Sequence, residues 1–139
     1  MRLVIAAALA GFACSVLAAD PSAEVAKSYT VRATAEPPSL RAGASGSIRF
    51  VIEPTGAVHV DPKAPLKVTL TATPGLVLKK SQLGRPDAVP AGQGLSFEAP
   101  FTASGAGRQE VKARLDFFLC TDQWCVKQVC ELAVAVDVK

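Results

Sequence analysis

The feature that most constrains the fold is a recurring pattern in which every second residue is apolar. It runs through residues 29–35, 48–52, 68–72, 95–101, 111–119 and 132–138, and Leu76–Leu78 adds a shorter segment. Side chains alternate between the two faces of a strand, so each segment predicts a strand with one buried face. Pro and Gly punctuate the intervals, as in Pro54-Thr55-Gly56 and Pro74-Gly75.

Short strands with Gly/Pro turns and no helical period after the first stretch predict an all-β fold. We expect an immunoglobulin-like antiparallel β-sandwich, with a closed barrel as the alternative. The chain has 139 residues, of which 50% are apolar, enough for one core. Its net charge of +3 is too small to indicate nucleic acid or anionic lipid as a partner.

The first 19 residues have the pattern of a targeting signal. Met1-Arg2 is a short positive head, Leu3–Leu17 is apolar, and small residues follow before Asp20. We therefore expect a cleaved signal peptide at 1–19 and one domain at 20–139, periplasmic or secreted and not membrane-spanning after cleavage. A retained anchor is the alternative. Cleavage removes Cys14 and leaves three cysteines in a compartment where disulfides persist.

Two strand patterns flank a four-residue link between Cys120 and Cys125, which predicts a hairpin. If Cys120 faces Cys125, this register also places Leu115 opposite Cys130 and Val111 opposite Val134 on the core face. On the other face it pairs the charged residues Arg114 and Glu131, and sets Phe118 against Lys127 as a cation–aromatic pair. Both pairings support the register.

The register divides the three remaining cysteines between the two faces of the hairpin. Cys120 and Cys125 are expected on the less buried face, where exposure favours an exchangeable disulfide. Cys130 is expected on the core face as a buried thiol. Pairing of Cys130 with a second chain, or disulfide shuffling, is the alternative.

The segment 114–132 resembles the end of the N-terminal periplasmic domain of the thiol:disulfide interchange protein DsbD family. The shared pattern is an aromatic strand, two cysteines four or five residues apart and a final strand. Weaker similarity covers Ala57–Pro65, Pro74–Leu76 and Arg85–Phe97. The chain differs from the family where Val126-Lys127 follows the second cysteine in place of proline, and in having no aromatic residue at 85–94.

The resemblance implies an immunoglobulin-like fold in which Cys120 and Cys125 are the redox pair. Electrons would come from a membrane thiol:disulfide reductase and pass to thioredoxin-like envelope proteins, which would make the domain an interchange enzyme that needs no cofactor. Trp124 and Phe118 are placed to shield the sulfurs or to dock a partner, and Lys127 to favour a thiolate. Packing of the hairpin is the alternative role for both aromatic residues.

A second function is a non-catalytic exported binding or assembly module whose hairpin disulfide is purely structural. No metal site is expected, because Cys130 points away from the other two cysteines and His59 is distant in sequence. His59 is interpreted as a loop or strand-end residue. The lack of a second His and of a Gly-x-Ser-x-Gly turn argues against a hydrolase.

Overall fold

The structure is a computed structural model that describes residues 28–61 and 63–139, and its elements are almost all strands. In chain order they are β1 (Tyr29–Glu36), β2 (Ser39–Leu40), β3 (Ser45–Pro54), β4 (His59–Val60), β5 (Lys67–Ala72), β6 (Leu76–Leu78), β7 (Gln82–Leu83), the 3-10 turn η2 (Arg85–Asp87), β8 (Val89–Ala91), β9 (Gly94–Ala103), β10 (Gly107–Cys120) and β11 (Cys125–Val138).

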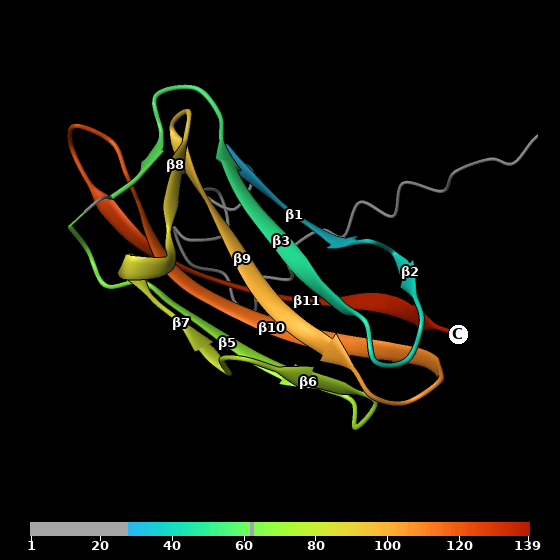
Figure 1. Cartoon of the computed structure of the whole chain (residues 1–139). Helices are drawn as coiled ribbons and strands as arrows, with labels where there is room; N and C mark the ends of the chain where they lie inside the picture. Colours follow the sequence, from blue (N-terminus) through green and yellow to red (C-terminus); the bar gives the residue numbers. More distant parts are fainter. Residues whose placement is uncertain (1–27, 62) are drawn as a thin grey trace, which may run out of the picture.

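The strands form two sheets that face one another (Figure 1). One sheet has the order β1-β3-β9-β6, with β8 also paired to β9. The other has the order β2-β11-β10-β5-β7, with β4 also paired to β10. All pairs are antiparallel except β2 with β11. The described residues therefore form the expected β-sandwich, and the barrel alternative is not realised.

The longest pairing joins β10 and β11 over their whole length. It runs without a break from Gly107 opposite Val138 to Cys120 opposite Cys125. The predicted partners Leu115–Cys130, Arg114–Glu131 and Phe118–Lys127 are all confirmed. Figure 1 shows that the turn of this hairpin lies at one end of the molecule and the C-terminus at the other.

The core lies between the sheets and is filled by the inward-facing residues of each apolar pattern. Its largest fully buried side chains include Phe50, Phe97, Phe101 and Phe117. Tyr29 joins the sheets, because its ring packs edge-on against Phe117 at a centroid distance of 5.3 Å. Its hydroxyl donates a 3.3 Å hydrogen bond to Gln128 Oε1, and Gln128 is the one buried polar or charged residue in the described core.

The short elements were not foreseen. β2 lies inside the tract 36–47 that was expected to be a connection, and β7, η2 and β8 lie inside the expected polar loop 79–94. Strands of two or three residues are too short to show a periodic pattern. The expected signal peptide at 1–19 lies outside the described residues. Within them, no helix has the length and apolar character needed to cross a membrane.

The chain's one tyrosine gives a pH test of the sandwich. Burial raises the pKa of Tyr29 from its ordinary value of 10.0 to about 12. The folded state holds the phenol proton more tightly than the unfolded state, so the stability from Tyr29 is full below about pH 10 and is lost as the pH rises towards 12. We expect only about a tenth of the phenol to be ionised in the folded chain at about pH 11, whereas the urea-unfolded chain ionises near pH 10. Ionisation near pH 10 with an intact circular dichroism spectrum would contradict the buried position.

Candidate functional site

A disulfide joins Cys120 and Cys125, the last residue of β10 and the first of β11. Their Cα atoms lie 4.1 Å apart, as expected for residues that face each other across a hairpin. The turn is closed by a 2.8 Å hydrogen bond from Thr121 N to Trp124 O. Trp124 is 39% exposed at this turn, so an aromatic ring is presented to solvent beside the sulfurs.

The two cysteines differ in exposure. Cys125 is exposed, as the sequence predicts. Cys120 lies on the same outer face of the hairpin, as predicted, but it is only 3% exposed, so its expected exposure is wrong. The reason is β4, whose residues His59 and Val60 pair with Cys120 and Leu119 and extend the sheet beside the end of β10. A partner protein can therefore approach the bond from the side of Cys125.

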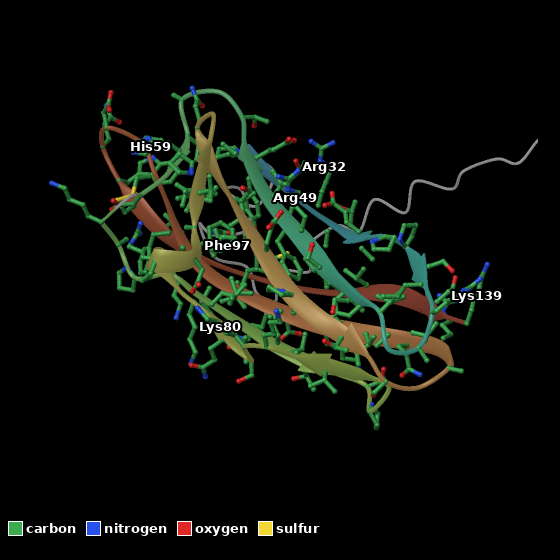
Figure 2. The ribbon with its side chains drawn as sticks, viewed as in Figure 1. Arg32, Arg49, His59, Lys80, Phe97 and Lys139 are labelled. Carbon is green, nitrogen blue, oxygen red and sulfur yellow. A yellow bond between two sulfur atoms is a disulfide. The ribbon has the colours of Figure 1, made fainter. Side chains whose placement is uncertain are left out.

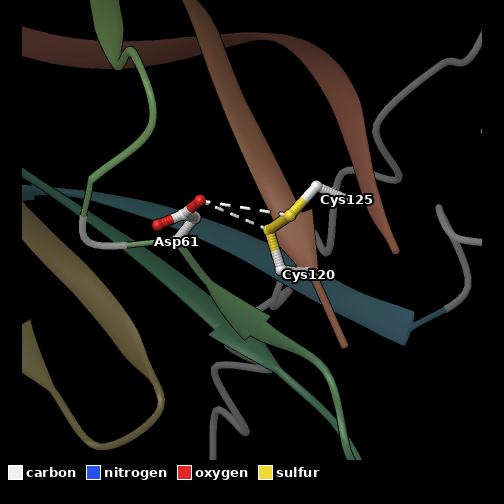
Figure 3. Close-up of side chains that lie close together, drawn as sticks. All are labelled: Asp61, Cys120 and Cys125. Atoms are coloured by element: carbon white, nitrogen blue, oxygen red, sulfur yellow. Dashed lines mark hydrogen bonds between the residues drawn. A yellow bond between two sulfur atoms is a disulfide. The ribbon is translucent and has the colours of Figure 1, made fainter. Parts of the chain in front are cut away.

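The side chain of Asp61 lies against the disulfide (Figure 3). Its Oδ2 atom is 3.5 Å from Sγ of Cys120 and 4.0 Å from Sγ of Cys125. In the disulfide neither sulfur carries a proton, so this is a contact with a carboxylate. After reduction, either thiol can donate its proton to the same oxygen.

The backbone holds Asp61 in this position from two sides. Asp61 N donates to Phe118 O at 3.1 Å, which ties the residue to β10. Arg85 of η2 donates from Nη2 to Asp61 O at 2.6 Å and from Nε to Ala64 O at 2.7 Å. Asp61 Oδ1 accepts from Lys63 N at 2.8 Å, so this oxygen is engaged while Oδ2 faces the sulfurs. Arg85 is thus a positioning residue for the carboxylate.

The charge of Asp61 has a chemical consequence only when the disulfide opens. A disulfide is neutral, whereas a thiolate beside a carboxylate is disfavoured by repulsion between like charges. At 4 Å that repulsion is about 1 kcal/mol even with the dielectric constant of bulk water, and more where water is excluded. Asp61 therefore favours the oxidised pair, or the neutral thiols, over a thiolate.

Phe118 and Lys127 line a groove on the outer face of the same sheet. The groove has a volume of about 660 Å³, and its other lining residues are Pro65, Leu66, Lys67, Thr69, Arg114 and Asp116. Phe118 and Lys127 are each two residues from a cysteine on the same strand face, so the groove adjoins the disulfide.

Arg114, Asp116 and Lys127 of this groove form ion pairs. Lys127 Nζ lies 4.0 Å from Asp116 Oδ1, and the expected contact with the Phe118 ring is not found among the described aromatic and cation contacts. The predicted ion pair between Arg114 and Glu131 is present at 3.7 Å. Lys127 therefore faces a carboxylate in the groove rather than the aromatic ring.

Cys130 is fully buried on the core face, as expected from the register. It is disulfide-bonded, so the expected thiol is wrong. Because Cys130 and the hairpin cysteines point to opposite faces of β11, this second bond is separate from the site at the turn.

The sequence predicts Cys120, Cys125, Phe118, Trp124 and Lys127 in this region, and the structure brings them to one end of the sheet. Figure 2 shows His59 at the same end as the disulfide. Sequence reasoning missed Asp61 because it lies 59 residues from Cys120. The available signal was the two-residue spacing of His59 and Asp61, which puts both side chains on one face if Val60 points to the core.

Comparison with known proteins finds similar solved structures but no related sequence. No family model matches the chain, and no curated protein matches it. A lipoprotein from Bacteroides thetaiotaomicron is 16% identical, with 78% of each chain covered and a TM-score of 0.48. A conjugative transposon lipoprotein from Bacteroides eggerthii is 12% identical, with 78% of this chain and 96% of that chain covered and a TM-score of 0.44.

A fimbrial protein is also similar in structure. The major subunit of aggregative adherence fimbriae type I from Escherichia coli is 8% identical, with 80% of this chain and 95% of that chain covered and a TM-score of 0.40. Similarity at this level concerns the arrangement of strands. The chemistry of the hairpin has to be argued from this chain's own residues.

Substitution of Asp61 tests the electrostatic role of the carboxylate. We expect Asp61→Asn to speed reduction of the Cys120–Cys125 bond by dithiothreitol about fivefold, because a repulsion of about 1 kcal/mol on the departing thiolate is removed. Asp122→Asn is the matched control, since it removes one carboxylate from the turn itself, and only Asp61 is grouped with both sulfurs. Equal rates for both variants would show that Asp61 does not act on the sulfurs.

Proposed function

We propose that this β-sandwich is an exported domain that exchanges its Cys120–Cys125 disulfide with the thiols of partner proteins. The observation that carries the proposal is the exposure of Cys125 at the end of the hairpin, beside the exposed ring of Trp124. Exchange needs one accessible sulfur for the incoming thiolate and a second sulfur that can leave. Cys125 meets the first requirement, and Cys120 is the leaving sulfur.

The exchange proceeds in two balanced steps with a partner dithiol. A partner thiolate attacks Cys125 Sγ, the disulfide breaks, and Cys120 leaves as a thiolate that takes up a proton. The partner's second thiol then attacks the mixed disulfide and releases Cys125 as a thiol. The domain has gained two electrons and two protons, the partner has become a disulfide, and the reverse sequence reduces the next protein.

The resemblance to the DsbD family suggests the classes of partner. The electron donor would be a membrane thiol:disulfide reductase, and the acceptors would be thioredoxin-like proteins of the envelope. Trp124 and the groove beside Phe118 and Lys127 adjoin the sulfurs, which suits them to contact such a protein while its thiol reaches Cys125.

The second candidate is a non-catalytic binding or assembly module in which the same bond is a permanent crosslink. Two observations favour it directly: Cys120 is 3% exposed, and the ladder of β10 and β11 is continuous to the turn. Closing a loop with a sequence separation of 5 stabilises the fold by about 2 kcal/mol on the chain-entropy account. The two functions therefore differ in how easily the bond is reduced.

A redox titration separates these functions. For exchange we expect the Cys120–Cys125 couple to have a midpoint above about −250 mV, in the range of proteins that pass electrons, whereas a structural bond is expected below about −300 mV. The midpoint can be measured by equilibrating the protein in glutathione or dithiothreitol buffers and counting alkylated cysteines by mass spectrometry of the peptide that contains both residues. A midpoint below about −300 mV would favour the crosslinked module.

The difference in exposure predicts asymmetric trapping. Cys120→Ser leaves the accessible Cys125, so the Cys125 thiolate should attack a thioredoxin-like protein whose single remaining cysteine carries a thionitrobenzoate leaving group, forming a mixed disulfide and releasing thionitrobenzoate. Cys125→Ser leaves only the covered Cys120 and should trap at least about tenfold less, because access limits the rate. Non-reducing electrophoresis measures the adduct, and the double Ser variant is the control. Equal trapping by both single variants would contradict attack at Cys125.

A further inference from the structure

We propose that the reduced hairpin turn binds a zinc ion through the thiolates of Cys120 and Cys125 and the carboxylate of Asp61. Among the described residues, these three offer ligand atoms that all lie within 4.8 Å of one another. Two sulfur ligands and one carboxylate oxygen form a donor set that zinc accepts in proteins. Figure 3 shows one oxygen of the Asp61 carboxylate facing both sulfurs of the disulfide.

The oxygen already lies close to the separation from each sulfur that a shared zinc ion requires. Zinc–sulfur distances of about 2.3 Å and zinc–oxygen distances of about 2.1 Å at a tetrahedral angle put a sulfur about 3.6 Å from an oxygen. The observed separations of Asp61 Oδ2 are 3.5 Å to Cys120 Sγ and 4.0 Å to Cys125 Sγ. Only the two sulfurs must move apart, and reduction frees them to do so.

The charges of the open site also favour a divalent cation. With both cysteines deprotonated, the three ligands carry three negative charges within 4.8 Å, and their mutual repulsion opposes this state. A zinc ion bound among them attracts each ligand, and this attraction outweighs the repulsion between the ligands. Asp61 is already held by Phe118 O and by Arg85, so little ordering of the carboxylate is needed.

His59 is the residue placed to supply a fourth ligand. It pairs directly with Cys120, and its neighbour Val60 pairs with Leu119, both of which are buried in the core. His59, Cys120 and Asp61 therefore project from the opposite, outer face. The ring nitrogens of His59 are not within the group at 4.8 Å, so the half-buried ring must rotate to reach the ion. Water completes a tetrahedral set if it does not.

Formation of the site requires a two-electron reductant: a dithiol is oxidised to its own disulfide, or a phosphine to its oxide with oxygen from water, while Cys120 and Cys125 each gain one electron and one proton. Zinc then displaces both thiol protons as it binds. This proposal goes beyond thiol exchange and does not depend on it, since a chemical reductant produces the same pair of thiols from a purely structural disulfide. Zinc binding and protein exchange can therefore succeed or fail separately.

The test uses the purified protein reduced with a phosphine under nitrogen, with Co²⁺ as a spectroscopic probe and Zn²⁺ as competitor. We expect one cobalt per chain, with thiolate-to-cobalt charge-transfer bands and the visible bands of a tetrahedral ion, all removed by one equivalent of Zn²⁺. The oxidised protein should show neither set of bands. Loss of an outer-shell partner alone typically weakens metal binding about 10–100-fold, so Asp61→Asn should weaken it at least about tenfold.

Three variants complete the design. Asp122→Asn removes a turn carboxylate that is not in the ligand group and should bind as the parent does. Cys130→Ala should keep the stoichiometry, because Cys130 points to the core. His59→Gln should weaken binding if the ring is the fourth ligand and leave it unchanged if water is. Absence of charge-transfer bands in the reduced parent, or equal affinity of Asp61→Asn and the parent, would overturn the proposal.

Discussion

The ladder between β10 and β11 determines where every other feature of the molecule lies. It joins the two strands from Gly107 opposite Val138 to Cys120 opposite Cys125. Because strand side chains alternate, this one register sends Leu115 and Cys130 into the core and the charged pairs to the outer face. A shift of one residue would reverse both faces and separate the cysteines, so core and disulfide depend on the same pairing.

This dependence explains why much of the fold could be predicted from the sequence. The apolar residues at 111–119 have odd numbers and those at 132–138 have even numbers, so they share a core face only in registers that pair odd with even residues. The pairing of Cys120 with Cys125 and that of Arg114 with Glu131 both give the same register of this kind. Several independent features thus agree on one register. The long strands β1, β3, β5 and β9 follow for the same reason, since each is long enough to show its period.

The part of the site that could not be predicted comes from contacts without a local pattern. β4 has two residues, too few for a period, and it reaches the end of β10 across 60 residues of chain. Its pairing buries Cys120 and carries Asp61 to the sulfurs. The anchor from Arg85 is a bond from one side chain to a backbone carbonyl, which no residue spacing encodes. The sequence therefore indicates the disulfide but not the carboxylate that faces it.

The effect of Asp61 on the possible functions of the hairpin depends on whether the two sulfurs are oxidised or reduced. A closed disulfide has no charge, so a carboxylate at 3.5 and 4.0 Å from its sulfurs contributes little to a permanent crosslink. The same carboxylate acts strongly once the bond opens, because every thiolate formed there meets a negative charge. The two thiolates can then take up protons, and the resulting dithiol can reduce a protein partner. Alternatively, a divalent cation can neutralise the thiolates and bind them. The position of Asp61 thus matters chiefly for the reduced state.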